Sequence, residues 1–231
     1  MLAFMNAEKS SMRRLFSPDS TIVDVLTKAF DLFVLNVIVV ICCIPIITIG
    51  PTLTALYYVT MKMAKGEEGY VYKTFFKAFK SNFKQGAVIG SVTTVVWVII
   101  WLDYAFIIGT DILAKEISDI LTVVVVIFAV IFMMASMYFF PLIARFENTS
   151  IGTVKNGLLL SISSLPRTML ILFEFAILPI VILQANNLGA LILMYGISLP
   201  CFLSSYSFVK IFEKIEEGNR EVDDCNERSK C

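Results

Sequence analysis

The sequence predicts an all-α membrane protein whose helices cross a bilayer several times, and three observations support this. Hydrophobic residues make up 58% of the chain and charged residues only 16%, whereas soluble domains carry about 25% charged residues. The mean hydropathy is +0.81. The stretch from Leu32 to Met61 contains no charged residue and is longer than the roughly 20 apolar residues that one transmembrane helix needs. A chain of 231 residues therefore has room for one membrane domain and no sizeable soluble one.

Charge divides the chain into three parts. Residues 1–28 mix acidic and basic side chains, among them Arg13 and Arg14, so we expect an amphipathic cytoplasmic lead-in and no signal peptide. Residues 29–209 form the helical membrane domain. Residues 210–231 are densely charged, and we expect a cytoplasmic tail that frays after one or two helical turns.

The uncharged stretch is too long for one straight crossing, and a hinge formed by Pro45, Gly50 and Pro51 interrupts it. The residues that follow the stretch, 62–84, are rich in lysine. Because basic residues favour the cytoplasmic side, both flanks should lie inside. We therefore expect two short segments or a re-entrant hairpin. The alternative is a single kinked crossing with the N-terminus outside.

The rest of the chain predicts four further membrane segments. Two of them are Gln85 to Leu102 and Ile120 to Ala144, which are uncharged. Two more come from Thr168 to Val209, which a polar turn at 184–187 divides. The total is six segments, or five if the first stretch crosses once. Both termini then lie on the cytoplasmic side of the cell (plasma) membrane.

Two loops predict amphipathic helices that lie along the cytoplasmic surface of the membrane. Between residues 72 and 84, aromatic residues and lysines each recur at three- and four-residue spacing, which places the two sets on opposite faces of an interfacial helix. The loop 145–166 contains an apolar stretch that also fits such a helix. The lipid bilayer is therefore a partner that the pattern itself implies.

The composition argues against several classes of function. The net charge is zero, so nucleic acid is not an expected partner. The chain has no histidine, the commonest metal ligand and general base, and its five cysteines include no C-x-x-C pair. No phosphate-binding glycine loop occurs. We expect no enzyme activity, no cofactor and no metal site.

Longer motifs resemble a known family. The chain contains FSPDS, FDLFVLN, CCIPIITIGPTLTALYYVTMKMAKGEEGY, FFKAFKSNFKQG and, later, YFFPLIARFENTSIGTVKNGLLLSISSLPRTMLIL. These segments are similar to the YesL-like family of bacterial integral membrane proteins, and the resemblance covers nearly the whole chain. It implies a link with carbohydrate uptake and utilisation systems. It carries no catalytic or binding residue over to this sequence.

Four polar residues within apolar segments are candidates for binding a substrate. Glu174 lies deep in a predicted membrane segment, where an acid is a candidate proton relay or substrate contact. A structural carboxylate is the alternative. Asn36, Thr48 and Thr52 lie around the predicted hinge and could offer an amide and hydroxyls to a sugar. The alternative is a tight hairpin whose threonines bond to their own helix.

Glu147, Gly152 and Lys155 are candidates for docking a partner. The loop that contains them faintly resembles the coupling loop of binding-protein-dependent sugar permeases, whose short helix docks on an ATPase subunit. The small residues that follow the acid in such loops are absent here. A plain interfacial helix is the alternative.

These features predict an accessory or subunit of carbohydrate uptake, with transporter subunits or an ATPase as partners and a homo-oligomer as an open alternative. A second hypothesis is a non-transporting membrane scaffold or signalling partner that binds proteins through its cytoplasmic loops. Transport predicts a polar cavity near Asn36, the hinge and Glu174. A scaffold predicts a packed bundle.

Overall fold

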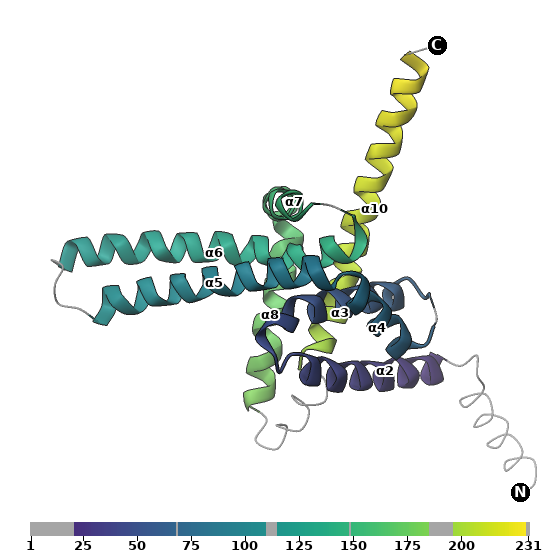
Figure 1. Ribbon diagram of the computed structural model, residues 1–231, viewed down its shortest axis with the longest axis horizontal. Helices are drawn as coiled ribbons and strands as arrows, with labels where there is room; N and C mark the ends of the chain where they lie inside the picture. Colours follow the sequence, from purple (N-terminus) through teal and green to yellow (C-terminus); the bar gives the residue numbers. More distant parts are fainter. Residues whose placement is uncertain (1–20, 68, 110–114, 148, 185–195, 230–231) are drawn as a thin grey trace, which may run out of the picture.

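The structure of the chain, a computed structural model, describes residues 21–67, 69–109, 115–147, 149–184 and 196–229 (Figure 1). Within those ranges all regular structure is helical, which confirms the predicted all-α class. The elements are α2 (Thr21–Cys42), the 3-10 helix η1 (Ile46–Thr48), α3 (Ile49–Ala64), α4 (Val71–Ser81), α5 (Phe83–Gly109), α6 (Lys115–Arg145), α7 (Ser150–Ser163), α8 (Leu165–Gln184) and α10 (Ser198–Ser229).

Helix α3 occupies the centre of the described fold. It packs against α2, α4, α5, α6 and α10, and most of its residues are buried. The hydroxyls of Thr54 and Thr60 donate to carbonyl oxygens one turn earlier, those of Gly50 and Leu56, both at 2.9 Å. Each hydroxyl thereby has an acceptor within α3, and that of Thr60 also accepts a hydrogen bond from the Ser205 hydroxyl of α10, at 2.8 Å. This helix can therefore be enclosed on most sides.

Helices α2 and α3 form a hairpin around the predicted hinge. Helix α2 ends at Cys42, and the chain turns through Pro45 and η1 before α3 begins at Ile49. Val23, near the start of α2, lines the same cavity as Met63, near the end of α3. The two ends of this hairpin therefore lie at the same end of the molecule, and the uncharged stretch folds back on itself.

Glycines bring α3 and α5 into backbone contact beside the hinge. A Cβ atom on Gly50 would overlap the Gly86 carbonyl group, and one on Gly90 would lie 2.7 Å from the Gly50 Cα atom. Gly86 and Gly90 have the four-residue spacing that lets membrane helices approach closely. The three glycines thus attach the start of α5 to the start of α3.

Three described helices are long and apolar enough to cross a membrane, namely Val23–Cys42 within α2, Phe83–Gly109 and Lys115–Arg145. Helices α7 and α8, bent by 98° where they meet, become a fourth if the pair is one broken span. The described part therefore has three or four candidate spans, fewer than the six or five expected. One reason is that the 16 residues of α3 extend only about 24 Å at 1.5 Å per residue. Another is that part of the last expected segment lies at 185–195, outside the described residues.

Helices α5 and α6 run side by side and project away from the other helices (Figure 1). They carry large exposed apolar side chains, including Val95, Trp101, Phe106, Val124 and Phe128. Apolar side chains exposed along two long helices suit contact with lipid. This arm is compatible with a membrane protein.

The aromatic residues of α4 lie on one side of the helix, as the spacing over residues 72–84 predicted, and the rings of Phe75, Phe79 and Phe83 follow one another along it. Helix α3 covers part of this side, which the sequence pattern did not show. Phe75 is fully buried, whereas Tyr72 and Phe76 are about half exposed, at 47% and 50%. Helix α4 packs on α3. Phe75 therefore lies in the contact between these two helices, whereas the sequence pattern placed it at the membrane surface. The prediction of a separate helix at this place is confirmed.

The expected fraying of the tail is wrong. Helix α10 continues as one helix to Ser229, and its C-terminal half extends beyond the other helices (Figure 1). Glu216 lies four residues before Arg220 and interacts with it electrostatically. An acid placed four residues before a base stabilises a helix, which is one reason why so charged a segment stays helical.

Candidate functional site

Asn36, a predicted substrate-binding residue, holds two helices together. Its side chain is 1% exposed, and its Oδ1 atom accepts hydrogen bonds from the backbone N–H groups of Ile197 and Ser198, both at 3.1 Å. These groups lie at the N-terminus of α10, where backbone N–H groups have no partner within the helix. Asn36 on α2 therefore caps α10.

The hinge residues form a compact turn. Pro45 precedes η1 in an extended conformation, and the Thr48 hydroxyl lies 2.6 Å from the carbonyl oxygen of Pro45 and 2.5 Å from that of Cys42. It donates to these carbonyl oxygens and closes the turn. Gly50 and Pro51 are buried. At Thr48 the geometry favours the tight-hairpin alternative over a hydroxyl that is free to bind a sugar.

Thr52 and Glu174 retain polar atoms that the fold does not use. Thr52 is fully buried, and its hydroxyl makes no hydrogen bond within the described ranges, although the Cys43 thiol lies close enough to interact weakly. Glu174 on α8 is half-buried, and its Oε2 atom is enclosed without a hydrogen-bond partner among the same residues. Because an enclosed, unpaired carboxylate oxygen is costly, Glu174 remains a candidate for function.

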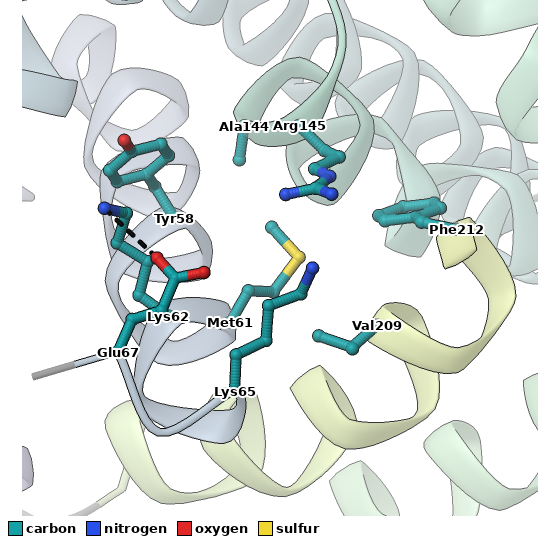
Figure 2. Close-up of a pocket in the computed structure, with 9 residues that line it drawn as sticks. All are labelled: Tyr58, Met61, Lys62, Lys65, Glu67, Ala144, Arg145, Val209 and Phe212. Carbon is teal, nitrogen blue, oxygen red and sulfur yellow. Dashed lines mark ion pairs between the residues drawn. The ribbon is translucent and has the colours of Figure 1, made fainter. Parts of the chain in front are cut away.

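Charged residues gather where α3, α6 and α10 meet, in a small cavity of about 80 Å³ that we call the charged cleft. Figure 2 shows Lys65 and Arg145 reaching toward its centre, with an ion pair between Lys62 and Glu67 at its edge. The Lys62 Nζ and Glu67 Oε2 atoms are 3.4 Å apart. The lining is Tyr58, Met61, Lys62, Lys65, Glu67, Ala144, Arg145, Val209 and Phe212.

Two ion pairs tie α10 to the other helices at the charged cleft. Lys65 Nζ lies 3.3 Å from Glu213 Oε1, and Arg145 donates to both carboxylate oxygens of Glu216, at 2.9 and 3.1 Å. These hydrogen bonds lower the pKa of the Glu216 carboxyl below its ordinary value, because they favour the ionised form. The cleft is far smaller than the roughly 300 Å³ of typical ligand sites, so its chemistry is that of a clamp between helices.

Sequence reasoning missed the charged cleft, since the acids that pair with Lys65 and Arg145 belong to the charged tail, for which no packing against other helices was expected. The spacing of charged residues in the sequence nevertheless contained a signal for this contact. Glu213 and Glu216 are three residues apart, so on a helix they point the same way. Lys65 and Arg145 follow apolar stretches that end at the same side of the predicted membrane. Opposite charges at matching depths could have suggested the pairing.

A larger cavity of about 790 Å³ opens between the first half of α2, the end of α3 and the start of α4. Asp24, Lys28 and Asp31 of α2 line it, and it shares Lys62 and Glu67 with the charged cleft. Both cavities therefore lie at the same end of the molecule. A third cavity, of about 430 Å³, lies between α5 and α6 and has a mostly apolar lining.

The predicted substrate-binding residues do not line the three cavities described above. None of these three cavities, all within the described residues, is lined by Asn36, Thr48, Thr52 or Glu174. Aromatic rings fill the space between α3, α6 and α10 instead. The Phe208 ring packs edge-on against Tyr57 at 5.6 Å and Tyr138 at 5.2 Å between ring centroids. Across the described helices, the interior is that of a packed bundle.

The predicted docking residues lie on α7 and just before it. Glu147 and Lys155 are exposed. The backbone N–H of Gly152 donates to the Thr149 Oγ1 atom at 3.2 Å, so Thr149 caps the N-terminus of α7. The docking candidates therefore surround a well-formed helix start.

Helix α7 packs on α6 through small residues. Its buried residues, Thr153, Gly157 and Ser161, are four apart, and a Cβ atom on Gly157 would lie 2.7 Å from the Phe139 ring of α6. Its large apolar side chains are exposed: Ile151, Val154, Leu158, Leu159 and Ile162. A helix that buries small residues and exposes large apolar ones needs lipid or a partner over its outer side.

Metal-ligating side chains are not clustered in the part of the chain that the structure describes. Among those residues, no three His, Cys, Asp or Glu side chains lie together in a way that could hold a metal ion. Cys42, Cys43 and Cys201 are free thiols.

Comparison with known protein families gives a match over part of the chain. The family described as "Protein of unknown function, DUF624" matches residues 32–104, and this domain is the one commonly called YesL-like. The matched range contains most of α2, the hinge, α3, α4 and most of α5. No curated protein and no solved structure matches the chain.

Proposed function

We propose that this chain is an integral protein of the bacterial plasma membrane and acts as an accessory of carbohydrate uptake that binds a partner protein. The observation that carries the proposal is the structural role of Asn36. This residue is almost fully buried, and its amide oxygen caps α10. A side chain that holds two helices together is not free to bind a sugar. The carbohydrate link itself rests on the YesL-like resemblance alone, because the matched family, DUF624, is described as one of unknown function.

The membrane location is supported by the three or four candidate spans and by the distribution of charge. The charged cleft, with Lys62 and Lys65, and the start of α4 lie at the end of the molecule where the α2–α3 hairpin begins and ends. Basic residues favour the cytoplasmic side, so we place this end inside. Both termini are then cytoplasmic, and six or five membrane segments remain part of the proposal.

The outer side of α7 is the proposed docking surface. Ile151 and Leu159 are 72% and 67% exposed, Lys155 is exposed between them, and Glu147 precedes the helix. An apolar row that contains one lysine and follows an acid fits a hydrophobic groove of a partner that also carries complementary charges. Transporter subunits or an ATPase of a carbohydrate uptake system are the proposed partners.

Site-specific photo-cross-linking tests this proposal. A photoreactive amino acid replaces Ile151 or Leu159 on α7, and Ile127 or Val130 on the α5–α6 arm serves as a matched control, since these side chains are also apolar and exposed. We expect the α7 positions to give one defined cross-linked protein from native membranes and the arm positions to give none. Cross-linking to lipid alone at α7 would contradict the proposal.

A second candidate function, a self-contained carrier, is favoured by Glu174. Its enclosed Oε2 atom has no hydrogen-bond partner among the described residues, and an acid inside the membrane is a candidate proton relay. Uptake by reconstituted vesicles tests this candidate. If the chain is a carrier, Glu174→Gln abolishes solute flux, whereas an accessory shows no flux in either form.

A further inference from the structure

The exposed part of α4 carries a basic face. Lys73, Lys77 and Lys80 recur at three- and four-residue spacing and are all exposed. Lys84 continues the series at the start of α5 and is also exposed. Residues 70–84 contain no acid, and within the described residues none of these four lysines forms an ion pair. The fold therefore leaves four like charges uncompensated along one helix.

An aromatic stripe lies between this basic face and the core. Phe75 and Ala78 are buried, whereas Tyr72, Phe76 and Phe83 are 47%, 50% and 39% exposed. At 3.6 residues per turn, three surfaces follow one another around α4: first the side buried against the core, then the aromatic stripe, then the basic face. This is the arrangement of a helix lying in a membrane surface, where rings sit at headgroup depth and lysines face the headgroups.

Helix α4 is joined to a candidate span almost without a loop. It ends at Ser81, and α5 begins at Phe83. The Asn82 backbone N–H donates to the Ala78 carbonyl at 3.0 Å, and the Gly86 N–H donates to the Asn82 carbonyl at 2.8 Å. This continuity holds α4 at the level where α5 enters the proposed bilayer.

We propose that the basic face of α4 binds the headgroups of anionic phospholipids in the cytoplasmic leaflet. Each lysine near a membrane surface favours anionic lipid about fivefold, and four lie together here. The aromatic stripe argues for lipid over an acidic protein, because exposed rings next to lysines match the polar–apolar boundary of a bilayer. Lys73 Nζ also lies 4.6 Å from the centroid of the Tyr70 ring, so ring and charge share one surface. The inference rests on the membrane location that the proposed function includes.

Tryptophan quenching tests the inference. Phe76→Trp is introduced into a Trp97→Phe, Trp101→Phe chain, which leaves the reporter at residue 76 as the sole tryptophan, since the chain has two. The protein is reconstituted into bilayers with equal amounts of phosphatidylglycerol and phosphatidylcholine, and one of the two carries brominated acyl chains. We expect brominated phosphatidylglycerol to quench about twofold more than brominated phosphatidylcholine. High salt should remove this preference.

Two charge variants show where the preference arises. Replacing Lys73, Lys77, Lys80 and Lys84 by Gln should equalise quenching by the two lipids. Replacing four exposed lysines elsewhere by Gln should leave the preference unchanged; these are Lys115, Lys155, Lys210 and Lys214. Equal quenching with α4 intact, or a preference that survives neutralisation of α4, would overturn the inference. Because the salt titration needs no lysine variant, it decides the question even if a variant misfolds.

The native Trp101 separates this inference from the membrane location. Trp101 lies on α5 and is 65% exposed, so in the unsubstituted chain both brominated lipids should quench it. If neither does, the membrane location fails, and the lipid inference fails with it. If both quench Trp101 while the residue-76 reporter shows no preference, only the lipid inference fails.

Discussion

Gly90 of α5 lies against the backbone of Gly50 on α3, so closely that a Cβ atom on Gly90 would be 2.7 Å from the Gly50 Cα atom and 2.9 Å from its nitrogen. This contact fixes the base of the α5–α6 arm to the turn that reverses the α2–α3 hairpin. The neighbouring atoms are backbone atoms and cannot swing aside. Gly50 and Gly90, which have no Cβ atom, therefore hold the arm against the hairpin.

Gly90→Ala should destabilise the protein strongly. Overpacking a close contact costs about 1–3 kcal/mol, and here the hairpin and the arm must move apart to make room. Thermal unfolding in detergent measures the effect. Gly109→Ala is the matched control on the same helix, since no heavy atom lies within 4 Å of its added Cβ. A Gly90→Ala protein as stable as Gly109→Ala would show that α3 and α5 are not in backbone contact.

Asn36→Ala should lower stability by about 2 kcal/mol, because it removes the acceptor of two backbone N–H groups at the start of α10. Thr27→Ala on the same helix is the control: Thr27 is exposed, and among the described residues its hydroxyl donates only to the Val23 carbonyl, at 2.8 Å. The free energy of unfolding of both variants is compared. Loss of activity in Asn36→Ala with full stability would point back to a substrate-binding role.

The Arg145–Glu216 pair should stabilise the protein near neutral pH and lose its effect in acid. The pKa of Glu216 is lower in the folded chain than in the unfolded chain. The stabilisation is therefore fully present above the unfolded pKa of about 4.3, and it disappears as the pH falls through the lower, folded pKa.

A double-mutant cycle with Arg145→Gln and Glu216→Gln measures this effect. Both side chains are partly exposed, so we expect a coupling energy of about 0.2–1 kcal/mol at pH 7 and close to zero at pH 2. A coupling energy that is the same at both pH values would mean that the charge of Glu216 does not contribute.

Cysteine labelling should place both ends of the α2–α3 hairpin on one side of the membrane. In a chain without its native cysteines, Asp24→Cys and Tyr70→Cys should react with a membrane-impermeant reagent only after the cytoplasmic face is opened. Asp103→Cys, toward the far end of the α5–α6 arm, should react in intact cells. Labelling of Asp24→Cys and Tyr70→Cys from opposite sides would support the single kinked crossing.

The elements that hydropathy controls could be predicted from the sequence. Uncharged stretches indicated α2, α5 and α6, and the turn residues Pro45 and Gly50 indicated the place where the first stretch reverses. Lysine and aromatic spacing located α4. These signals are local, because each depends only on the hydropathy, residue spacing and turn residues of a single segment.

The contacts between distant segments could not be predicted in this way. Asn36 looks the same in the sequence whether it binds a sugar or caps a helix 162 residues later. Phe75 and Phe76 are both aromatic, and only the position of α3 decides that the first is buried. Arg145 and Glu216 are 71 residues apart and pair because α10 brings Glu216 to the end of α6, a packing that charge density alone does not indicate.

The measurement that tests the central claim most directly is co-purification from native membranes under gentle detergent extraction. The forms compared are the unsubstituted chain, Ile151→Asn/Leu159→Asn on α7, and Glu174→Gln. If the chain is a docking accessory, a transporter subunit or ATPase accompanies the unsubstituted and Glu174→Gln forms and is lost from the α7 variant. If the chain is a carrier, the α7 variant loses no partner, while Glu174→Gln alone stops carbohydrate uptake by the cells. That result would contradict a docking role for α7.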